Sequence, residues 1–422
     1  MDTIFALSSG RPPAAVSIIR VSGPNAHRAG EGLAGSLPAP RAAALRELRH
    51  PRTGELLDEA LVIRFDSPAS STGEDVVEFQ CHGGRAVVDA VLAALAGIDG
   101  LRAAQPGEFT RRAFENGRID LTEAEGLADL IEAETESQRK AALALSEGGL
   151  RKQIDDWQQR LLDLSAEAER AIDYDEDDEA VDSALVRECD ALAAELRQWV
   201  ERPRIELLKD GVRVVVAGPP NAGKSSLINA IAGEERAIVT DIPGTTRDHI
   251  EVPLSLDGVP VLLTDTAGLR KSEDEVEAIG VTRAERLIEA SDVLVWVGDG
   301  APPAHPRVIK VHAKADLPAR AEAPADAIAV SAATGDGVKM LLERVGAAAR
   351  VLLPPEGAIA LNRRQASHIE EAKSALESAD PSDVVLLSES LRVARAAFDR
   401  LTGHAGVEDV LDALFSRFCL GK

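Results

Sequence analysis

The sequence has few cysteines, and their placement excludes a fold stabilised by disulfides or by a cysteine-bound zinc ion. Its three cysteines, Cys81, Cys189 and Cys419, are odd in number and widely spaced. That pattern excludes a disulfide framework and a cysteine-based zinc site. We expect two of them to be ordinary buried or helical thiols, whereas Cys419 lies in the terminal FCLGK and is treated separately below.

The sequence also lacks long hydrophobic runs. No apolar run reaches the ~18 residues that a membrane-spanning helix needs. The first residues, MDTIFALSSGR, are acidic at their start and carry no basic n-region. We therefore expect no secretory signal and a cytoplasmic protein.

Positive charge is scarce, because 47 Lys and Arg stand against 71 Asp and Glu, a net charge of −24. This balance argues against a broad nucleic-acid-binding surface, which needs clustered basic residues. Any RNA contact is expected to be local or made through a partner. The acidic run DYDEDDEAVD at 173–182 is interpreted as a solvated helix end or loop.

The chain contains enough apolar residues for several cores. Its 422 residues, 45% of them apolar, predict two to four globular domains. Residues 1–118 predict an α+β domain, since one amphipathic helix, RAVVDAVLAALAGI, follows several β-rich runs: AVSIIRVSG, ALVIRFDSP and DVVEFQCHGG.

The rest of the chain predicts a helical domain interrupted by an α/β domain. Residues 119–209 show helical spacing with almost no strand signal, and Thr122 and Glu125 are spaced as a capping box. Residues 210–352 alternate apolar strands with helices, which predicts an α/β domain with a mixed sheet flanked by helices. The five predicted strands are VRVVVAG, VPVLLTDT, DVLVWVGD, RVIKVHA and AIAVSA. Residues 353–422 are helical again. The simplest architecture is an α/β domain inserted into an all-helical domain.

The segment Gly218–Ser225 matches the phosphate-binding motif G-x-x-x-x-G-K-S between a strand and a helix. Glycines let backbone N–H groups surround phosphates, and the helix N-terminus adds its dipole. Lys224 is expected to reach the β- and γ-phosphates, and Ser225 to bind Mg²⁺. The contacts predicted here are Asn221, Ala222, Gly223, Lys224, Ser225 and Ser226.

Two downstream segments match the nucleotide-sensing switches of a GTPase. The first is a polar loop in which Thr246 is expected to complete the Mg²⁺ shell. The second closes an apolar strand; Asp265 is expected to hold Mg²⁺ through water and the Gly268 N–H to sense the γ-phosphate. The full set is Thr240, Asp241, Ile242, Pro243, Gly244, Thr245 and Thr246, then Asp265, Thr266, Ala267 and Gly268.

Hydrolysis needs a group that orients water, and Ras-type GTPases place a Gln for this task directly after the second switch motif. Here that residue is Leu269, which cannot orient water. The residues that follow supply several carboxylates, and composition alone singles out none of them: Glu273, Asp274, Glu275 and Glu277.

The segment VHAKADLP lies where a GTPase reads guanine, but Ala313 replaces the usual Asn. Asp316 can accept hydrogen bonds from guanine N1–H and the 2-amino group, and Lys314 can lie over the base. Losing one hydrogen bond costs ~0.5–1.5 kcal/mol, so we expect a weaker but guanine-selective site. The predicted base contacts are Ala313, Lys314, Ala315 and Asp316, with Ser331, Ala332 and Ala333 in the next loop.

These residues together resemble the tRNA modification GTPase family (MnmE, also called TrmE). The resemblance covers the whole chain, and the PGEFT segment and the CxGK end are its most specific parts. It rests on NAGKSSLINA, TDIPGTTRD, DTAGLR with EVEAIG, RVSG, TGEDVVEFQCHGG, PGEFTRRAFENGRIDLTEAE and FCLGK.

The resemblance implies a GTPase that works in tRNA modification. With an FAD-dependent partner, MnmG, the family adds aminomethyl or carboxymethylaminomethyl groups to C5 of the wobble uridine. A 5-formyl- or 5,10-methylene-tetrahydrofolate supplies the one-carbon unit. The resemblance further implies a homodimer formed by a folate-binding N-terminal domain, a heterotetramer with the partner, and G domains that pair when GTP and K⁺ are bound.

Site residues follow from the resemblance position by position. Asn221, Thr240, Ile242 and Thr245 match the K⁺ site, and a K⁺ beside the phosphates can neutralise developing charge. Glu277 matches the catalytic Glu of the family, which helps to position the attacking water and so takes the role that Leu269 cannot fill. The folate contacts matched are Arg20, Glu78, Arg118, where the family often has Lys, and Lys422. Cys419 becomes a candidate participant in the one-carbon chemistry.

Two other functions remain open from the sequence. A degenerate G domain that only holds nucleotide as a scaffold is supported by Ala313 alone. It is opposed by five intact residues: Lys224, Ser225, Thr246, Asp265 and Glu277. A ribosome-assembly GTPase would share the switches, but it would predict a basic RNA-binding domain that the sequence does not contain.

Overall fold

The computed structural model describes residues 2–174, 183–233, 251–265, 285–320, 322–355, 358–380, 382–405 and 408–421. The chain divides into two compact units. The first comprises Met1–Ala128, Ser146–Gln159 and Arg395–Lys422, and the second comprises Asp129–Leu145 and Arg160–Ala394. This division does not test the four segments expected from sequence, 1–118, 119–209, 210–352 and 353–422, which stay a prediction.

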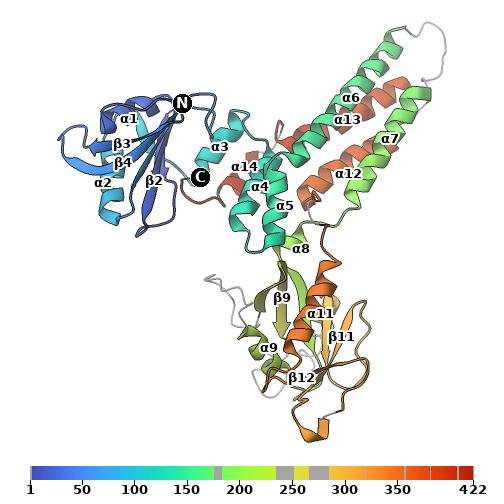
Figure 1. The fold of residues 1–422 in the computed structure, drawn as a ribbon. Coiled ribbons are helices and arrows are strands. Elements are labelled where there is room, and N and C mark those ends of the chain that lie inside the picture. The colour runs from blue at the N-terminus through green and yellow to red at the C-terminus, as the bar shows by residue number, and fades with distance from the viewer. Residues whose placement is uncertain are drawn as a thin grey trace, which may run out of the picture. The chain divides into compact units, whose positions relative to one another are not determined.

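The first unit is built on a six-stranded sheet of order β3-β4-β5-β2-β1-β6, drawn in blue and cyan in Figure 1. Its pairs are antiparallel except for β1 with β6. The strands are β1 Thr3–Leu7, β2 Val16–Ser22, β3 Ala43–Arg49, β4 Leu56–Phe65, β5 Val76–His82 and β6 Leu101–Ala103.

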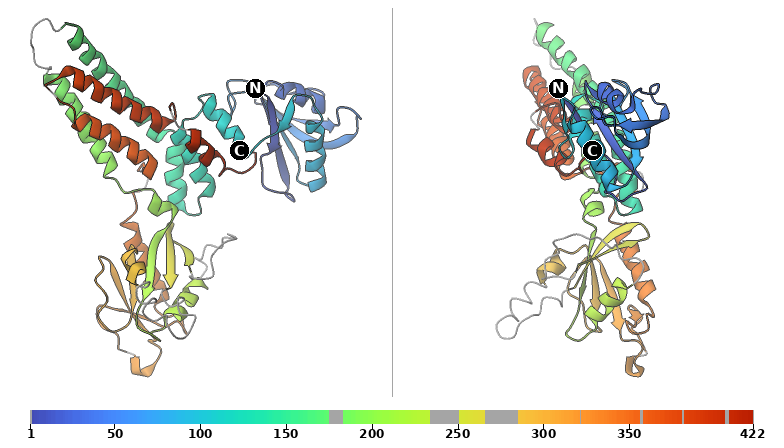
Figure 2. Two further views of the ribbon diagram at one scale, coloured as in Figure 1. Left: turned by 180° about the vertical axis from the view of Figure 1, so that it is seen from behind. Right: turned by 90° about the vertical axis from the view of Figure 1, so that its left-hand side faces the viewer.

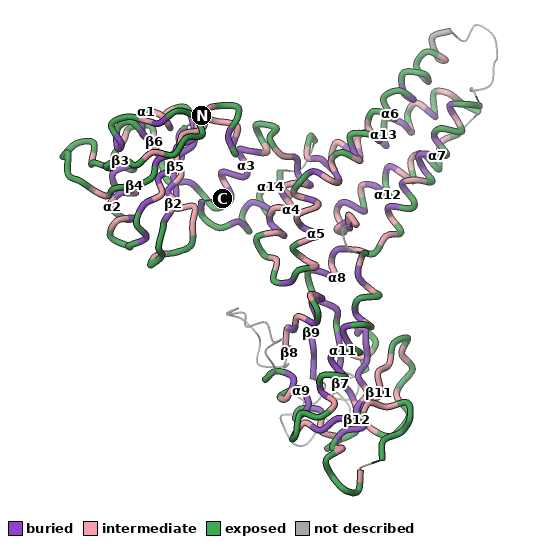
Figure 3. Tube along the Cα trace, in the orientation of Figure 1, coloured by how far each residue is buried: buried purple, intermediate pink, exposed green. Residues whose placement is uncertain are grey.

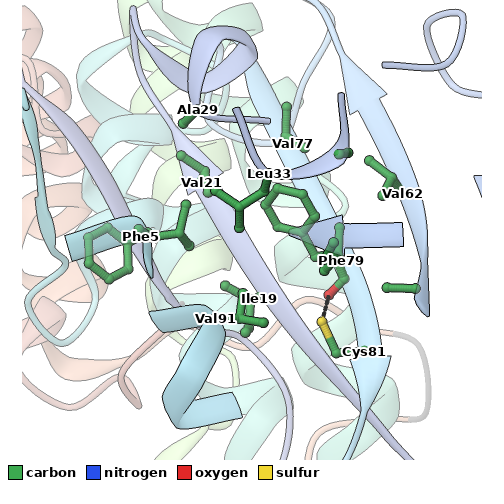
Figure 4. Close-up of a cluster of buried hydrophobic side chains, with 14 of the residues drawn as sticks. Phe5, Ile19, Val21, Ala29, Leu33, Val62, Val77, Phe79, Cys81 and Val91 are labelled. Atoms are coloured by element: carbon green, nitrogen blue, oxygen red, sulfur yellow. Dashed lines mark hydrogen bonds between the residues drawn. The ribbon is translucent and has the colours of Figure 1, made fainter. Parts of the chain in front are cut away.

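Helices α1 (Ala26–Ala34) and α2 (Arg85–Ala96) pack on this sheet. Alternating residues of the strands point to the helices, so Ile19, Val21 and Phe79 are almost fully buried. Figure 4 shows these side chains meeting Leu33 of α1 and Val91 of α2. The α+β prediction for this region is confirmed.

Helices α3 (Glu108–Glu115) and α4 (Leu121–Glu132) follow the sheet. The capping box predicted at Thr122 and Glu125 is wrong by two residues. Asp120 Oδ1 accepts from the Glu123 N–H at 2.8 Å, and Glu123 Oε2 accepts from the Asp120 N–H at 2.8 Å. Thr122 instead donates its hydroxyl to Asp120. The helix therefore starts earlier because an aspartate caps it more strongly than the threonine two residues later.

Most of the remaining helices are amphipathic, and buried residues recur along the longer ones in Figure 3. In the first unit Trp157 stacks on Phe398 with ring centroids 5.6 Å apart. In the second unit Arg197 pairs with Glu377 across two adjacent helices. The helices are α5 Glu136–Ser146, α6 Gly149–Tyr174, α7 Ser183–Val200, α8 Glu206–Lys209, α12 Arg363–Glu377, α13 Val384–Thr402 and α14 Glu408–Phe415.

Helices α7 and α12 lie side by side in Figure 1 and in the left-hand view of Figure 2, although the α/β domain separates them in sequence. Trp157 and Phe398 likewise come from opposite sides of that domain. Chain segments before and after the α/β domain therefore pack on one another, as expected for an insertion.

The α/β domain in the second unit has a sheet of order β12-β11-β10-β7-β9-β8. All pairs are parallel except β8 with β9. The sequence predicted five of these strands and missed β8. The elements are β7 Val212–Ala217, α9 Lys224–Ala232, β8 Glu251–Leu256, β9 Val259–Asp265, β10 Val293–Val297, β11 Val308–Ala313, η2 Pro318–Arg320, β12 Ile328–Val330 and α11 Val338–Arg350.

The predicted fold class is confirmed: an α+β domain, a helical domain and a P-loop α/β domain with a mixed sheet. Among the residues described, no helix combines the length and the apolar character needed to cross a membrane.

Candidate functional site

The phosphate loop joins the end of β7 to the start of α9, at the carboxyl edge of parallel strands. Gly218 has φ +154°, and a Cβ placed on it would lie 2.1 Å from the Val297 carbonyl oxygen. Asn221 and Gly223 also have positive φ, at 61° and 100°. The loop thus needs glycine at Gly218 for space and at Gly223 for conformation.

Lys224 is the first residue of α9, and only 8% of it is exposed. Its Nζ donates to the carbonyl oxygens of Gly218 and Pro219, both at 2.9 Å. The ammonium group is therefore held inside the curl of the loop. A charge in this position, beside the N-terminus of a helix, is placed to attract phosphate oxygens.

Ser225 lies one residue further along α9, and its hydroxyl donates to Asp265 Oδ2 at 2.9 Å. Asp265 ends β9 and is fully buried. Hydroxyl and carboxylate oxygens are the ligands that Mg²⁺ prefers near phosphates. These two residues therefore fit the Mg²⁺ site that the sequence predicted.

The guanine-reading segment begins where β11 ends, beside the phosphate loop. Lys314 has φ 62°, and its Nζ donates to the Asn221 carbonyl oxygen at 2.7 Å. The Ala315 N–H donates to Val330 O at 3.2 Å. Ser331 donates its hydroxyl to Asp316 Oδ1 at 2.7 Å, so the two loops predicted to contact the base meet at Asp316.

Ala332 and Ala333 lie in the turn that follows β12, which closes when the Gly335 N–H donates to Ser331 O at 2.9 Å. Ala313 is 7% exposed. Its methyl group lies 3.8 Å from the point where a Cβ on Gly223 would sit. The position that usually carries Asn therefore faces the phosphate loop, and here it offers no polar atom to it.

Several predicted site residues lie outside the described part of the chain. They are Thr240, Asp241, Ile242, Pro243, Gly244, Thr245, Thr246, Thr266, Ala267, Gly268, Glu277 and Lys422. Their roles stay predictions. The interpretation of the acidic run at 173–182 also stays a prediction, because residues 175–182 are not described.

The N-terminal sheet brings together two of the residues matched to folate contacts. Arg20 on β2 lies opposite Glu78 on β5, and its Nε donates to Glu78 Oε1 at 2.9 Å. The guanidinium carbon lies 5.6 Å from the centre of the Phe109 ring. Arg118 is exposed, and its side chain packs near Gly73. An arginine, a carboxylate and an aromatic ring are suitable partners for a flat, polar heterocycle.

The C-terminal tail packs on the strand next to this pair. Gly421 is buried with φ 92°, and a Cβ on it would lie 2.0 Å from the Leu7 carbonyl oxygen. Leu7 and Ala6 of β1 pair with Ile19 and Arg20 of β2. The tail therefore reaches the strand pair that carries Arg20, and Cys419 within it is exposed.

Comparison with known families covers nearly the whole chain. The model of the GTP-binding protein TrmE N-terminus matches residues 3–118, and the model of the MnmE helical domain matches residues 121–419. The tRNA modification GTPase MnmE of Rhizorhabdus wittichii is 52% identical over 428 residues, covering 100% of this chain and 97% of that protein. The corresponding protein of Novosphingobium aromaticivorans is 49% identical over 435 residues and is covered in full. The chain belongs to the MnmE family of tRNA modification GTPases.

Membership of the MnmE family confirms the resemblance found in the sequence, and it makes the chain a GTPase. It also accounts for a P-loop domain placed between two helical segments that pack together.

The thiols divide as the sequence predicted. Cys81 and Cys189 are buried, and burial raises the pKa of Cys81 to about 12 and that of Cys189 to about 11. Both therefore stay protonated and unreactive at neutral pH. Exposed Cys419 is left as the accessible thiol among the three.

Sequence reasoning missed a group behind the guanine-reading segment: Asp299, His312 and Arg320. Arg320 donates to the Ala313 carbonyl oxygen at 2.8 Å and to Asp299 at 3.0 Å. No sequence signal separates this arginine from other surface arginines, because its contacts depend on the short turn η2 that returns it to β11.

Proposed function

We propose that this chain is a K⁺-stimulated GTPase. Together with an FAD-dependent partner of the MnmG type, it would add an aminomethyl or carboxymethylaminomethyl group to C5 of the wobble uridine of tRNA. The observation that carries the proposal is the end-to-end match to proteins named tRNA modification GTPase MnmE, on a chain whose phosphate loop is complete.

In the G domain, the contacts described support a role for each of the following residues. Lys224 points its ammonium into the loop and would bind the β- and γ-phosphates. Ser225 and Asp265, joined at 2.9 Å, would hold Mg²⁺ together with Thr246. A bound Mg²⁺ supplies neutralisation of phosphate charge. Asp316, held by Ser331, would accept from guanine, and Lys314 would cover the base.

K⁺ and water are assigned to residues around this centre. Asn221, which is exposed and has a φ of 61°, would ligate K⁺ with Thr240, Ile242 and Thr245. Glu277 would orient the attacking water, the task that Leu269 cannot perform.

The N-terminal domain would bind a tetrahydrofolate derivative and form the homodimer. Arg20, Glu78, Arg118 and Lys422 would contact the folate. The packing of Gly421 against β1 supports a tail that reaches this site, with Cys419 beside it. A homodimer bound to the flavin partner would form the heterotetramer, and tRNA would be its substrate.

Steady-state GTP turnover in KCl and in NaCl tests the GTPase part. We expect turnover about tenfold or more higher in K⁺, because a cation at the phosphates acts as an electrostatic catalyst. Asn221→Ala should give equal, low rates in both salts, whereas Asn229→Ala, an exposed asparagine on α9, should keep the difference. Equal rates for the unmodified chain would contradict the K⁺ role, and absent turnover would favour a nucleotide-holding scaffold.

A further inference from the structure

A small charged network lies behind the guanine-reading segment. Arg320 is the last residue of η2, and its side chain turns back to β11. Its Nε donates to the Ala313 carbonyl oxygen at 2.8 Å, and one terminal nitrogen donates to Asp299 Oδ1 at 3.0 Å. The guanidinium group thus links the end of β11 to the loop after β10.

His312 completes the network from inside the sheet. It is 5% exposed, with Nδ1 2.7 Å from Asp299 Oδ1 and Nε2 3.0 Å from the Arg320 carbonyl oxygen. The hydrogen bond from His312, assisted by Arg320, lowers the pKa of Asp299. The carboxylate therefore stays charged at neutral pH and holds both partners.

The hydrogen bond from Arg320 to the Ala313 carbonyl oxygen holds the peptide group that precedes Lys314 and Asp316, the residues assigned to guanine recognition. The Ala313 carbonyl belongs to the peptide that joins Ala313 to Lys314, and Lys314 has a φ of 62°, which non-glycine residues rarely adopt. Fixing this peptide fixes the direction in which the chain leaves β11 toward Asp316. In the common motif an Asn side chain at this position can brace the loop, but Ala313 has only a methyl group.

We propose that Arg320, held by Asp299 and His312, is a positioning residue for guanine recognition. It fixes the Ala313–Lys314 peptide from behind and so performs the bracing that the missing Asn side chain does not. The inference rests on the proposed assignment of Asp316 as the guanine reader.

The first test measures equilibrium binding of GDP, IDP and ADP to the full chain and to Arg320→Ala. IDP lacks the 2-amino group from which Asp316 would accept a hydrogen bond. The ratio of GDP to IDP affinity therefore reports how well Asp316 is placed. We expect Arg320→Ala to weaken GDP binding roughly three- to tenfold, the range for one or two lost hydrogen bonds, and to lower the GDP-to-IDP ratio. The matched control is Arg344→Ala, an exposed arginine on α11, which should change neither.

The second test asks whether the two braces substitute for one another. In an Ala313→Asn background, Arg320→Ala should cost clearly less GDP affinity than in the native background, because an Asn at 313 faces the phosphate loop. Asp299→Asn keeps the shape of the side chain but removes its charge. It should also lower GDP affinity, by less than Arg320→Ala does.

Three results would overturn the inference. One is unchanged GDP affinity in Arg320→Ala. Another is an equal loss for GDP and IDP with a lowered melting temperature, which would mean that Arg320 only stabilises the fold. The last is an equal loss in the native and Ala313→Asn backgrounds. Equal affinity of the unmodified chain for GDP and ADP would instead remove the assignment of Asp316 itself, so the two failures are distinguishable.

Discussion

Single residues decide whether the phosphate loop can form. A Cβ added to Gly218 would clash with the Val297 carbonyl oxygen, which would lie only 2.1 Å away. A Cβ added to Gly300 would meet nothing within 4 Å. We expect Gly218→Ala to cost roughly 2 kcal/mol of stability and to weaken nucleotide binding, since the loop must shift. Gly300→Ala is the control and should leave both within error. Thermal unfolding and GDP titration measure the two effects; normal GDP binding by Gly218→Ala would contradict the loop geometry.

The three thiols differ in accessibility, and this difference is measurable. Cys419 is exposed, whereas burial protects Cys81 and Cys189 and raises the pKa of each. A thiol reagent at pH 7.5 should modify one cysteine per chain quickly and all three only in denaturant. Cys419→Ser should abolish the fast phase. Fast labelling that survives this substitution would show that the tail or one of the buried thiols is placed differently.

At the scale of elements, the C-terminal tail depends on one glycine. Gly421 is buried against Leu7 of β1 with φ 92°, so any side chain both strains the backbone and clashes. We expect Gly421→Ala to release the tail, making it more sensitive to carboxypeptidase, and to weaken binding of 5-formyl-tetrahydrofolate about tenfold or more. Gly10→Ala, where an added Cβ meets nothing within 4 Å, is the control. Unchanged folate affinity would separate the tail from the folate site.

The elements also show how far the sequence determines the fold. Strands with continuous apolar runs, such as β7 and β10, were predictable because both faces are buried. β8, with the sequence EVPLSL, was missed because it is an edge strand that carries a proline and buries only Leu254 and Leu256. The start of α4 was displaced because two capping signals overlap and the aspartate prevails.

The candidate site was predictable where a motif fixes geometry and not where geometry depends on a turn. Lys224, Ser225 and Asp265 come together as their motifs require. The pairing of Arg20 with Glu78 depends on strand register, which periodicity does not give, and the family resemblance matched each residue only to a folate contact. Arg320 was invisible because its partner, the Ala313 backbone, has no side-chain signature.

At the scale of the whole molecule, the net charge of −24 limits direct contact with tRNA. Each phosphate contact contributes a salt slope of about −0.7 to −0.9 in log–log binding plots, so a chain with few contacts has a shallow slope. We expect this chain alone to bind tRNA at about micromolar affinity or weaker, with a slope on the order of −1 to −3. Filter binding across KCl concentrations measures both. Nanomolar affinity with a steep slope would mean that a basic surface exists after all.

The central claim is that this GTPase modifies the wobble uridine of tRNA together with a flavin partner. The most direct measurement incubates the chain with that partner, GTP, K⁺, Mg²⁺, a tetrahydrofolate derivative, an amine donor and unmodified tRNA, then analyses the nucleosides by mass spectrometry. We predict a uridine carrying an aminomethyl-type group at C5 in the complete mixture, and none when Lys224→Ala replaces the native chain. Unmodified wobble uridine in the complete mixture, with GTP turnover intact, would contradict the claim.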